Sequence, residues 1–96
     1  MRNNFILDSK FFCVACGKEG IPIARRKGRE REPGHLKKLF CLNCHKETNH
    51  AEVREFSRYS YKDFLLEFEK GNFSEEGNRI LTLGEFRDKL HKEGVI

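Results

Sequence analysis

The chain has no tryptophan, one methionine and only two prolines among its 96 residues. No apolar run comes near the ~20 residues that a membrane-spanning helix needs. The opening residues, MRNNFILDSK, lack the apolar core and the small-residue cleavage site of a secretory signal peptide. We therefore expect a cytoplasmic protein without a membrane segment, in which thiols stay reduced.

Cysteine is scarce but ordered. The four cysteines fall in two CxxC pairs, Cys13 with Cys16 and Cys41 with Cys44. Two such pairs supply the four thiolates of a tetrahedral structural Zn²⁺ site. Two disulfides are the alternative, which the expected reducing compartment disfavours, and a redox CxxC site would leave the second pair unexplained. We predict that these four cysteines bind Zn²⁺.

Groups for catalysis are also lacking. Four thiolates close the coordination shell of zinc, whereas a catalytic zinc keeps an open position. No further cysteine can act as a nucleophile, and no paired-carboxylate or Ser/His/Asp pattern stands out. We predict that the protein is not an enzyme and has no small-molecule substrate. His45 and His50 follow the second pair, and whether either assists the metal site stays open.

The segments around the cysteine pairs predict short strands. Residues 1–10 read as a short lead, residues 20–24 as an edge strand with Pro22, and residues 36–40 and 51–59 as two further strands. Strands interleaved with two knuckles are typical of a zinc ribbon with a three-stranded antiparallel sheet. Apolar residues make up 38% of the chain, so we expect a small core whose folding depends on the metal.

The last third of the chain predicts two short helices. Apolar residues recur at helical spacing from Tyr61 to Phe68, with Ser60 as N-cap and Gly71 as the stop. A second helix is indicated by a capping box from Thr82 to Glu85. The predicted fold is therefore a small α+β protein, with a zinc-ribbon module over residues 1–59 and a two-helix C-terminal extension over residues 60–96.

Positive charge is concentrated between the cysteine pairs. The net charge of the chain is +4, whereas residues 24–38 hold seven basic and two acidic residues, a net charge of +5. Such a segment favours contact with a polyanion, and a merely solvated loop is the alternative. We predict nucleic-acid contacts from this basic loop, residues 25–38, and from Arg58 or Tyr59. The loop residues are Arg25, Arg26, Lys27, Arg29, Arg31, His35, Lys37 and Lys38.

The segments FFCVACGKEG and LKKLFCLNCHKETNH resemble the zinc-stapled core of HNH endonucleases. In this resemblance His45 takes the place of the final metal-binding histidine of that family. The paired Asp-His or His-His and the asparagine of the family are missing, which implies that this chain does not cut nucleic acid.

The stretches ARRKG, HLKKLFC and CHKETNH are also similar to small zinc-ribbon proteins of phages and prophages of Gram-positive bacteria. That resemblance implies an accessory protein and leaves its target open. The CxxC…NH pattern is similar to one zinc-bearing family of large-subunit ribosomal proteins over about ten residues.

Two functions follow as hypotheses, with an HNH-like nuclease as a third. The first is nucleic-acid binding without catalysis through the basic loop. The second is a phage-type factor that docks on a host protein of transcription or defence through its aromatic tail. Burial of the tail phenylalanines on the ribbon would indicate a structural tail, and an open apolar patch would favour a protein partner. These residues are Phe64, Phe68, Phe73 and Phe86.

Overall fold

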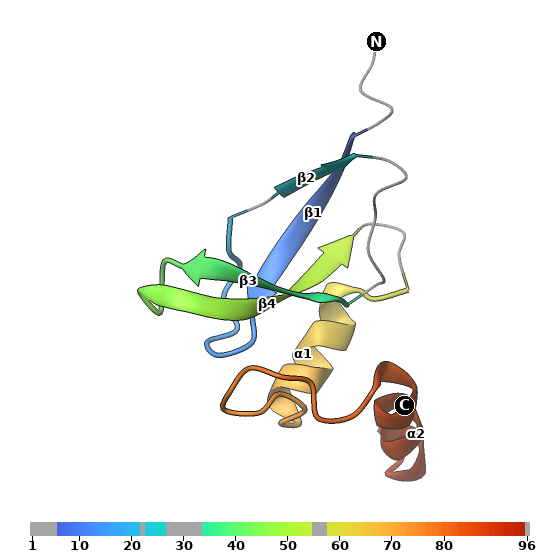
Figure 1. Ribbon diagram of the computed structural model, residues 1–96. Helices are drawn as coiled ribbons and strands as arrows, with labels where there is room; N and C mark the ends of the chain where they lie inside the picture. The colour runs from blue at the N-terminus through green and yellow to red at the C-terminus, as the bar shows by residue number, and fades with distance from the viewer. Residues whose placement is uncertain (1–5, 22, 27–33, 55–57, 96) are drawn as a thin grey trace.

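The computed structural model describes residues 6–21, 23–26, 34–54 and 58–95. Four strands form one antiparallel sheet in the order β2-β1-β4-β3, and both helices lie on the same side of it (Figure 1). The predicted class, a small α+β protein with an antiparallel ribbon sheet and two C-terminal helices, is confirmed. The elements are β1 (Ile6–Cys13), β2 (Ile23–Arg26), β3 (Leu36–Cys41), β4 (Lys46–Arg54), α1 (Tyr61–Glu69) and α2 (Leu83–Lys92).

The sheet has one strand more than the three that the sequence predicts. The prediction of a lead over residues 1–10 is wrong from Ile6 onward, because β1 starts there and lies between β2 and β4. Neighbouring residues of a strand point to opposite faces. Phe11 and Phe12 are nevertheless both buried, with exposed fractions of 0% and 7%. Because β1 is buried on both faces here, it lacks the apolar/polar alternation that marks a half-buried strand.

Two strand boundaries also differ from the prediction. β2 contains Arg25 and Arg26, which were expected in the loop, and Pro22 lies outside the described residues. β4 starts at Lys46 rather than at residue 51. It forms a hairpin with β3 whose register runs from Cys41 opposite Lys46 to Leu36 opposite Ala51. The second cysteine knuckle therefore occupies the turn of a hairpin, and pairing begins directly after it.

Both helices match the prediction. Each begins with a complete capping box, Ser60 with Asp63 and Thr82 with Glu85, in which the cap side chain accepts from the backbone N–H three residues later. α1 ends just before Gly71, whose φ of 77° is a left-handed conformation that favours glycine. None of the described helices has the length and apolar character to cross a membrane.

The helical tail and the sheet share one hydrophobic core. Phe12, Val14 and Ala51 cluster with Tyr59, the last residue of the predicted ribbon module, and with Phe64 of α1. The ring centroids of Phe12 and Phe64 lie 5.3 Å apart. The predicted ribbon module and the predicted helical extension thus pack on each other. The boundary between them at residue 59 stays a prediction.

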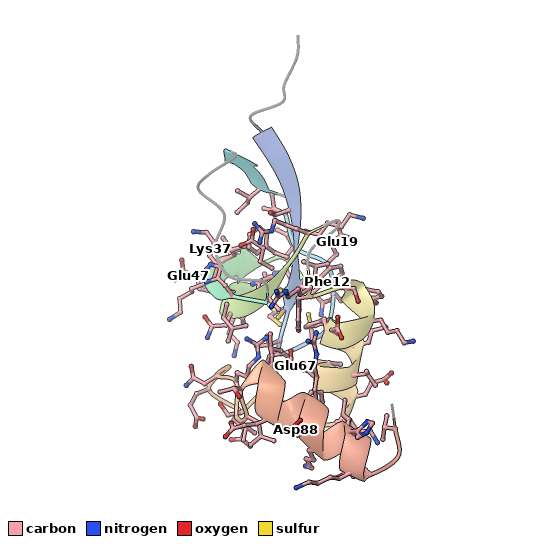
Figure 2. The ribbon with its side chains drawn as sticks, turned by 90° about the vertical axis from the view of Figure 1, so that its right-hand side faces the viewer. Phe12, Glu19, Lys37, Glu47, Glu67 and Asp88 are labelled. Carbon is pink, nitrogen blue, oxygen red and sulfur yellow. The ribbon has the colours of Figure 1, made fainter. Side chains whose placement is uncertain are left out.

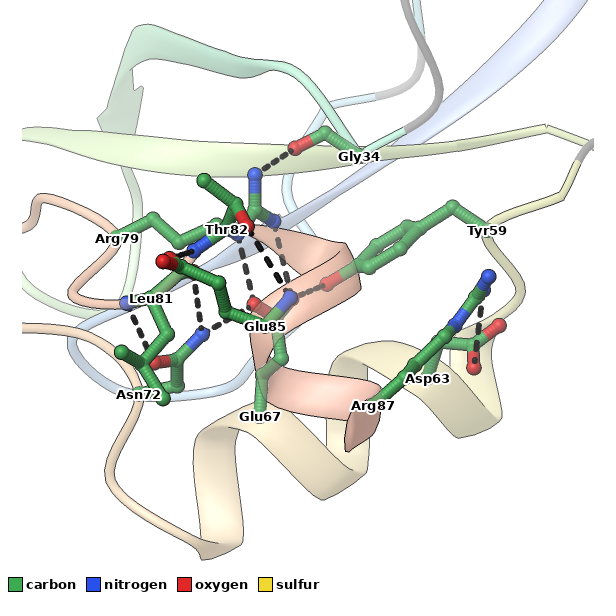
Figure 3. A network of polar contacts seen from close by, with 10 residues as sticks. All are labelled: Gly34, Tyr59, Asp63, Glu67, Asn72, Arg79, Leu81, Thr82, Glu85 and Arg87. Atoms are coloured by element: carbon green, nitrogen blue, oxygen red, sulfur yellow. Dashed lines mark hydrogen bonds and ion pairs between the residues drawn. The ribbon is translucent and has the colours of Figure 1, made fainter. Parts of the chain in front are cut away.

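A buried polar network centred on Glu67 of α1 fixes this packing (Figure 3). Glu67 is fully buried, and its carboxylate accepts hydrogen bonds from Arg79 Nε at 2.7 Å, from Arg79 Nη2 at 2.9 Å and from Asn72 Nδ2 at 2.7 Å. The Tyr59 hydroxyl donates to the same carboxylate. Arg79 Nη1 also donates to the carbonyl of Gly34 at 2.8 Å, which ties the tail to the segment just before β3.

Tyr59 therefore corrects a prediction. It was expected to contact nucleic acid, but its side chain is fully buried in this network. Burial first, and then the Glu67 carboxylate, raise the pKa of Tyr59 well above its usual range. Arg58 is exposed, and its carbonyl accepts a hydrogen bond from Arg87 of α2 at 2.9 Å.

Candidate metal centre

Two similar turns bring the cysteine pairs together. Cys13 ends β1 and Cys41 ends β3, and each carbonyl accepts a hydrogen bond from the backbone N–H four residues later, at 2.8 Å in both cases. Those donors are Gly17, with φ of 80°, and His45, with φ of 60°. Each knuckle thus closes on a residue in the left-handed region.

The knuckle backbone also points N–H groups at sulfur. The N–H of Ala15 lies 3.4 Å from Cys13 Sγ, and the N–H of Cys44 lies 3.4 Å from Cys41 Sγ. The hydroxyl of Thr48, on β4, lies 3.0 Å from Cys13 Sγ. Hydrogen-bond donors of this kind stabilise thiolates and orient them toward a metal.

The four sulfur atoms form a compact cluster that fits a tetrahedral metal ion. They all lie within 4.8 Å of one another, and the described residues hold no other cluster of this kind. Cys13 Sγ and Cys44 Sγ are 3.9 Å apart, and Cys16 Sγ and Cys41 Sγ are 3.7 Å apart. Four sulfurs at 2.3 Å from a tetrahedral zinc would be separated by about 3.8 Å. The cysteines are free thiols, so the alternative of two disulfides is not what the structure contains.

The clustered thiols influence one another's ionisation. Burial opposes ionisation of Cys41, but the N–H groups of Cys44 and Asn43 outweigh it and lower the pKa of this thiol to about 7. Desolvation and the neighbouring sulfurs raise the pKa of Cys44 to about 12. Without a cation, one thiolate therefore suppresses ionisation of the next. Metal ligation requires all four thiols to be deprotonated. The positive charge of a divalent ion would offset the repulsion between the four thiolates.

The two histidines near the second knuckle lie outside the sulfur cluster. His45 is exposed and closes the knuckle turn, whereas His50 is fully buried on β4 opposite Cys13. The Nδ1 atom of His50 lies 2.9 Å from the carbonyl of Thr48, and burial lowers the pKa of the ring. His91 of α2 is exposed. The candidate metal centre thus consists of cysteines only.

Four of the eight predicted nucleic-acid-binding residues lie on the edge strands of the sheet. Arg25 and Arg26 belong to β2 and Lys37 and Lys38 to β3, the two outer strands. Lys38 is exposed and Lys37 is half-buried. Figure 2 shows Lys37 on the side of the molecule away from α1. Lys27, Arg29 and Arg31 lie outside the described residues.

His35 has an acidic neighbour that the sequence did not indicate. Its Nε2 atom lies 3.9 Å from the carboxylate of Glu52, which is buried and accepts a hydrogen bond from the Ser9 hydroxyl at 2.6 Å. Glu52 follows two buried residues of β4, His50 and Ala51, so no alternation marked it. The sequence holds a clearer indication that Glu67 is buried, because this residue lies three residues after Phe64 on the apolar face of its helix.

Comparison with models of protein families, with curated proteins and with solved structures finds no match for this chain.

Proposed function

We propose that this protein is a structural zinc ribbon that binds nucleic acid through residues 25–38 and has no catalytic activity. The observation that carries the proposal is the placement of the basic segment. It starts on β2 and ends on β3, the two outer strands of a sheet whose two knuckles bring four cysteines together. A small rigid frame that presents a positive segment is suited to binding a polyanion.

Zinc is the metal that this donor set favours. Thiolate ligands in a tetrahedral arrangement are typical of Zn²⁺ or of iron–sulfur sites, and paired CxxC knuckles are typical of structural zinc. Four protein ligands leave no coordination position for water or substrate. The ion would stabilise the fold and supply no Lewis-acid chemistry.

The absence of catalysis has its own test. Supercoiled plasmid incubated with the zinc-loaded protein and Mg²⁺ or Mn²⁺ is expected to stay intact. Nicking that disappears in a His35→Ala or a His45→Ala variant would instead favour the HNH-like nuclease.

Phosphate contacts would supply the affinity, and they carry no sequence information. Each neutralised phosphate contributes about −0.9 to the slope of log K against log salt on duplex DNA and about −0.7 on single strands. With Glu30 and Glu32 offsetting two of the cations, we expect a slope of about −3 to −4 on duplex DNA and little sequence preference.

The test compares two triple variants of equal net charge by fluorescence anisotropy over a salt series. Replacing Arg25, Arg26 and Lys27 by Ala should weaken binding to all sequences alike and flatten the slope by up to about 3 units. Replacing three exposed lysines of the tail should change it little, and these are Lys62, Lys70 and Lys92. If the wild type binds neither DNA nor RNA at ~50 mM salt, or if both variants behave alike, the basic segment is only a solvated surface.

The phage-type interaction factor remains the second hypothesis. Phe64 and Phe86 are buried, and the half-buried Phe68 and Phe73 pack against the core, so these residues form no open patch on the tail. The burial favours a structural tail. A pull-down from a bacterial host with and without nuclease distinguishes a protein partner, which survives the nuclease, from one bridged by nucleic acid.

A further inference from the structure

The outer strand β3 and the knuckle after it expose two large apolar side chains. Phe40 is 48% exposed and Leu42 is 66% exposed. The core in this part of the chain is made by other residues, so neither side chain is needed there. β3 pairs only with β4, and its other border is an edge of the described sheet. An aromatic ring is thus presented to solvent at the margin of the fold.

One cation and the ring lie on the same face of this edge. Lys38 and Phe40 are two residues apart on β3, so they lie on one face about 7 Å from each other. Lys37, the residue before Lys38, is half-buried and lies on the opposite face of the strand. The acidic residue directly across the ladder is Glu47 of the neighbouring strand β4, which pairs with Phe40 in the register, and Figure 2 shows Glu47 on the same side of the molecule as Lys37. Positive charge therefore lies before the ring, and negative charge lies beside it.

We propose that Phe40 is a stacking platform for an unpaired base, and that the ligand of the basic segment is single-stranded nucleic acid. This inference rests on the proposed function and specifies its ligand. A phosphate would lie at Lys38, which is exposed on the face of Phe40, whereas Glu47 would repel a phosphate at the position of Phe40. An uncharged base fits there, because its face can stack on the ring. Bases of a duplex are stacked on each other and cannot offer that face.

A second copy of the chain is a poorer occupant of the same edge. Antiparallel pairing of two β3 strands would bring Lys37 and Lys38 of one copy close to the same residues of the other, and like charges in such pairs are destabilising. Lysines on an edge strand are a common device against this kind of association. The charge of the edge thus favours a polyanion over a copy of itself.

The experiment measures binding of the zinc-loaded protein to a labelled 12-nucleotide single strand and to a duplex of the same length, at one fixed salt concentration. We expect the wild type to bind the single strand at least tenfold more tightly than the duplex. Phe40→Leu should weaken single-strand binding about 5- to 100-fold, because stacking on an aromatic ring is lost. The salt slope should not change, since no charge is removed.

Two matched variants control for shape and for loss of apolar surface. Phe40→Tyr keeps an aromatic ring and should keep the affinity within about twofold. Ile80→Ala removes another exposed apolar side chain, 59% exposed in the tail, and should have no effect. A 2-aminopurine base in the single strand should change its fluorescence on binding to the wild type and to Phe40→Tyr, and much less with Phe40→Leu.

The outcomes separate this inference from the proposed function. Single-strand binding that Phe40→Leu leaves unchanged, or a preference for the duplex, overturns the platform and leaves nucleic-acid binding intact. Failure to bind either ligand overturns both. If sedimentation shows a dimer that Phe40→Leu dissociates, Phe40 is a contact between copies and the platform is wrong.

Discussion

At the scale of single residues, the two knuckles differ in how they close. Gly17 adopts its φ of 80° without cost, whereas His45 holds φ of 60° with a side chain that disfavours it. The left-handed conformation costs a non-glycine residue about 1–2 kcal/mol in the folded state. Glycine avoids this cost, but its greater freedom in the unfolded chain offsets part of the gain. We expect His45→Gly to raise the free energy of unfolding by about 0.5–1 kcal/mol, measured by denaturant unfolding of the metal-loaded protein.

The matched change in the first knuckle is Gly17→Ala. It should lower the free energy of unfolding by 1 kcal/mol or more, because the added Cβ would stand 3.0 Å from the Phe68 ring in an unfavourable conformation. If His45→Gly destabilised the protein as well, the histidine side chain would contribute to the knuckle in a way that its exposure does not suggest.

Tyr59 makes stability sensitive to alkaline pH. Its pKa is raised in the folded protein, by burial and by Glu67, so the unfolded state loses this proton at a lower pH than the folded state. The contribution of the neutral hydroxyl is complete below the unfolded pKa of about 10 and is lost as the pH rises beyond it. We expect the melting temperature to fall above about pH 10, and to fall less steeply in Tyr59→Phe. Tyr61→Phe, at a half-exposed tyrosine, should leave the wild-type profile.

At the scale of elements, Glu67 is the junction between α1, the 72–82 segment and the backbone before β3. Truncating it leaves the Arg79 guanidinium, with its side chain 17% exposed, without its carboxylate. Removing one partner of a buried ion pair costs about 3–5 kcal/mol. We therefore expect Glu67→Leu to lower the free energy of unfolding by that amount, measured with denaturant, while exposed Glu69→Ala changes it by less than about 0.5 kcal/mol.

The double variant Glu67→Leu with Arg79→Leu tests the cause. It removes both charges, so it should be less destabilised than Glu67→Leu alone. If the single and double variants were equally unstable, the loss would come from packing rather than from an unpaired charge.

The elements that the sequence predicted are those fixed by neighbours in the chain. Ser60 with Asp63 marks the start of α1, and the CxxC spacing alone indicated the sulfur cluster. β1 was missed because both of its faces are buried around Phe11 and Phe12, which removes the period-two signal. The role of Glu67 was missed because its partner Arg79 is twelve residues away, across a turn whose geometry the sequence does not give.

At the scale of the whole molecule, we expect the fold to depend on a metal ion held by the four cysteines. One knuckle follows β1 and the other follows β3, and β4 separates these two strands in the sheet. Loss of a metal bound between the knuckles would therefore release the ends of both strands at once. Structural zinc contributes about 10–16 kcal/mol in small modules, as much as the total stability of a typical domain. We expect one equivalent of zinc to copurify, and chelation or Cys44→Ser to unfold the first sixty residues, followed by circular dichroism and elemental analysis.

Thr48→Val separates loss of the metal from loss of a supporting contact. It removes the hydroxyl 3.0 Å from Cys13 Sγ but keeps all four ligands, so the protein should still fold with zinc while its zinc affinity falls about 10- to 100-fold. Acid should release the metal in both proteins, because protons compete with zinc for the thiolates, and it should do so at a higher pH in the variant. A well-folded protein without metal, or one with two disulfides by mass spectrometry, would show that the cysteines do not serve a zinc ribbon.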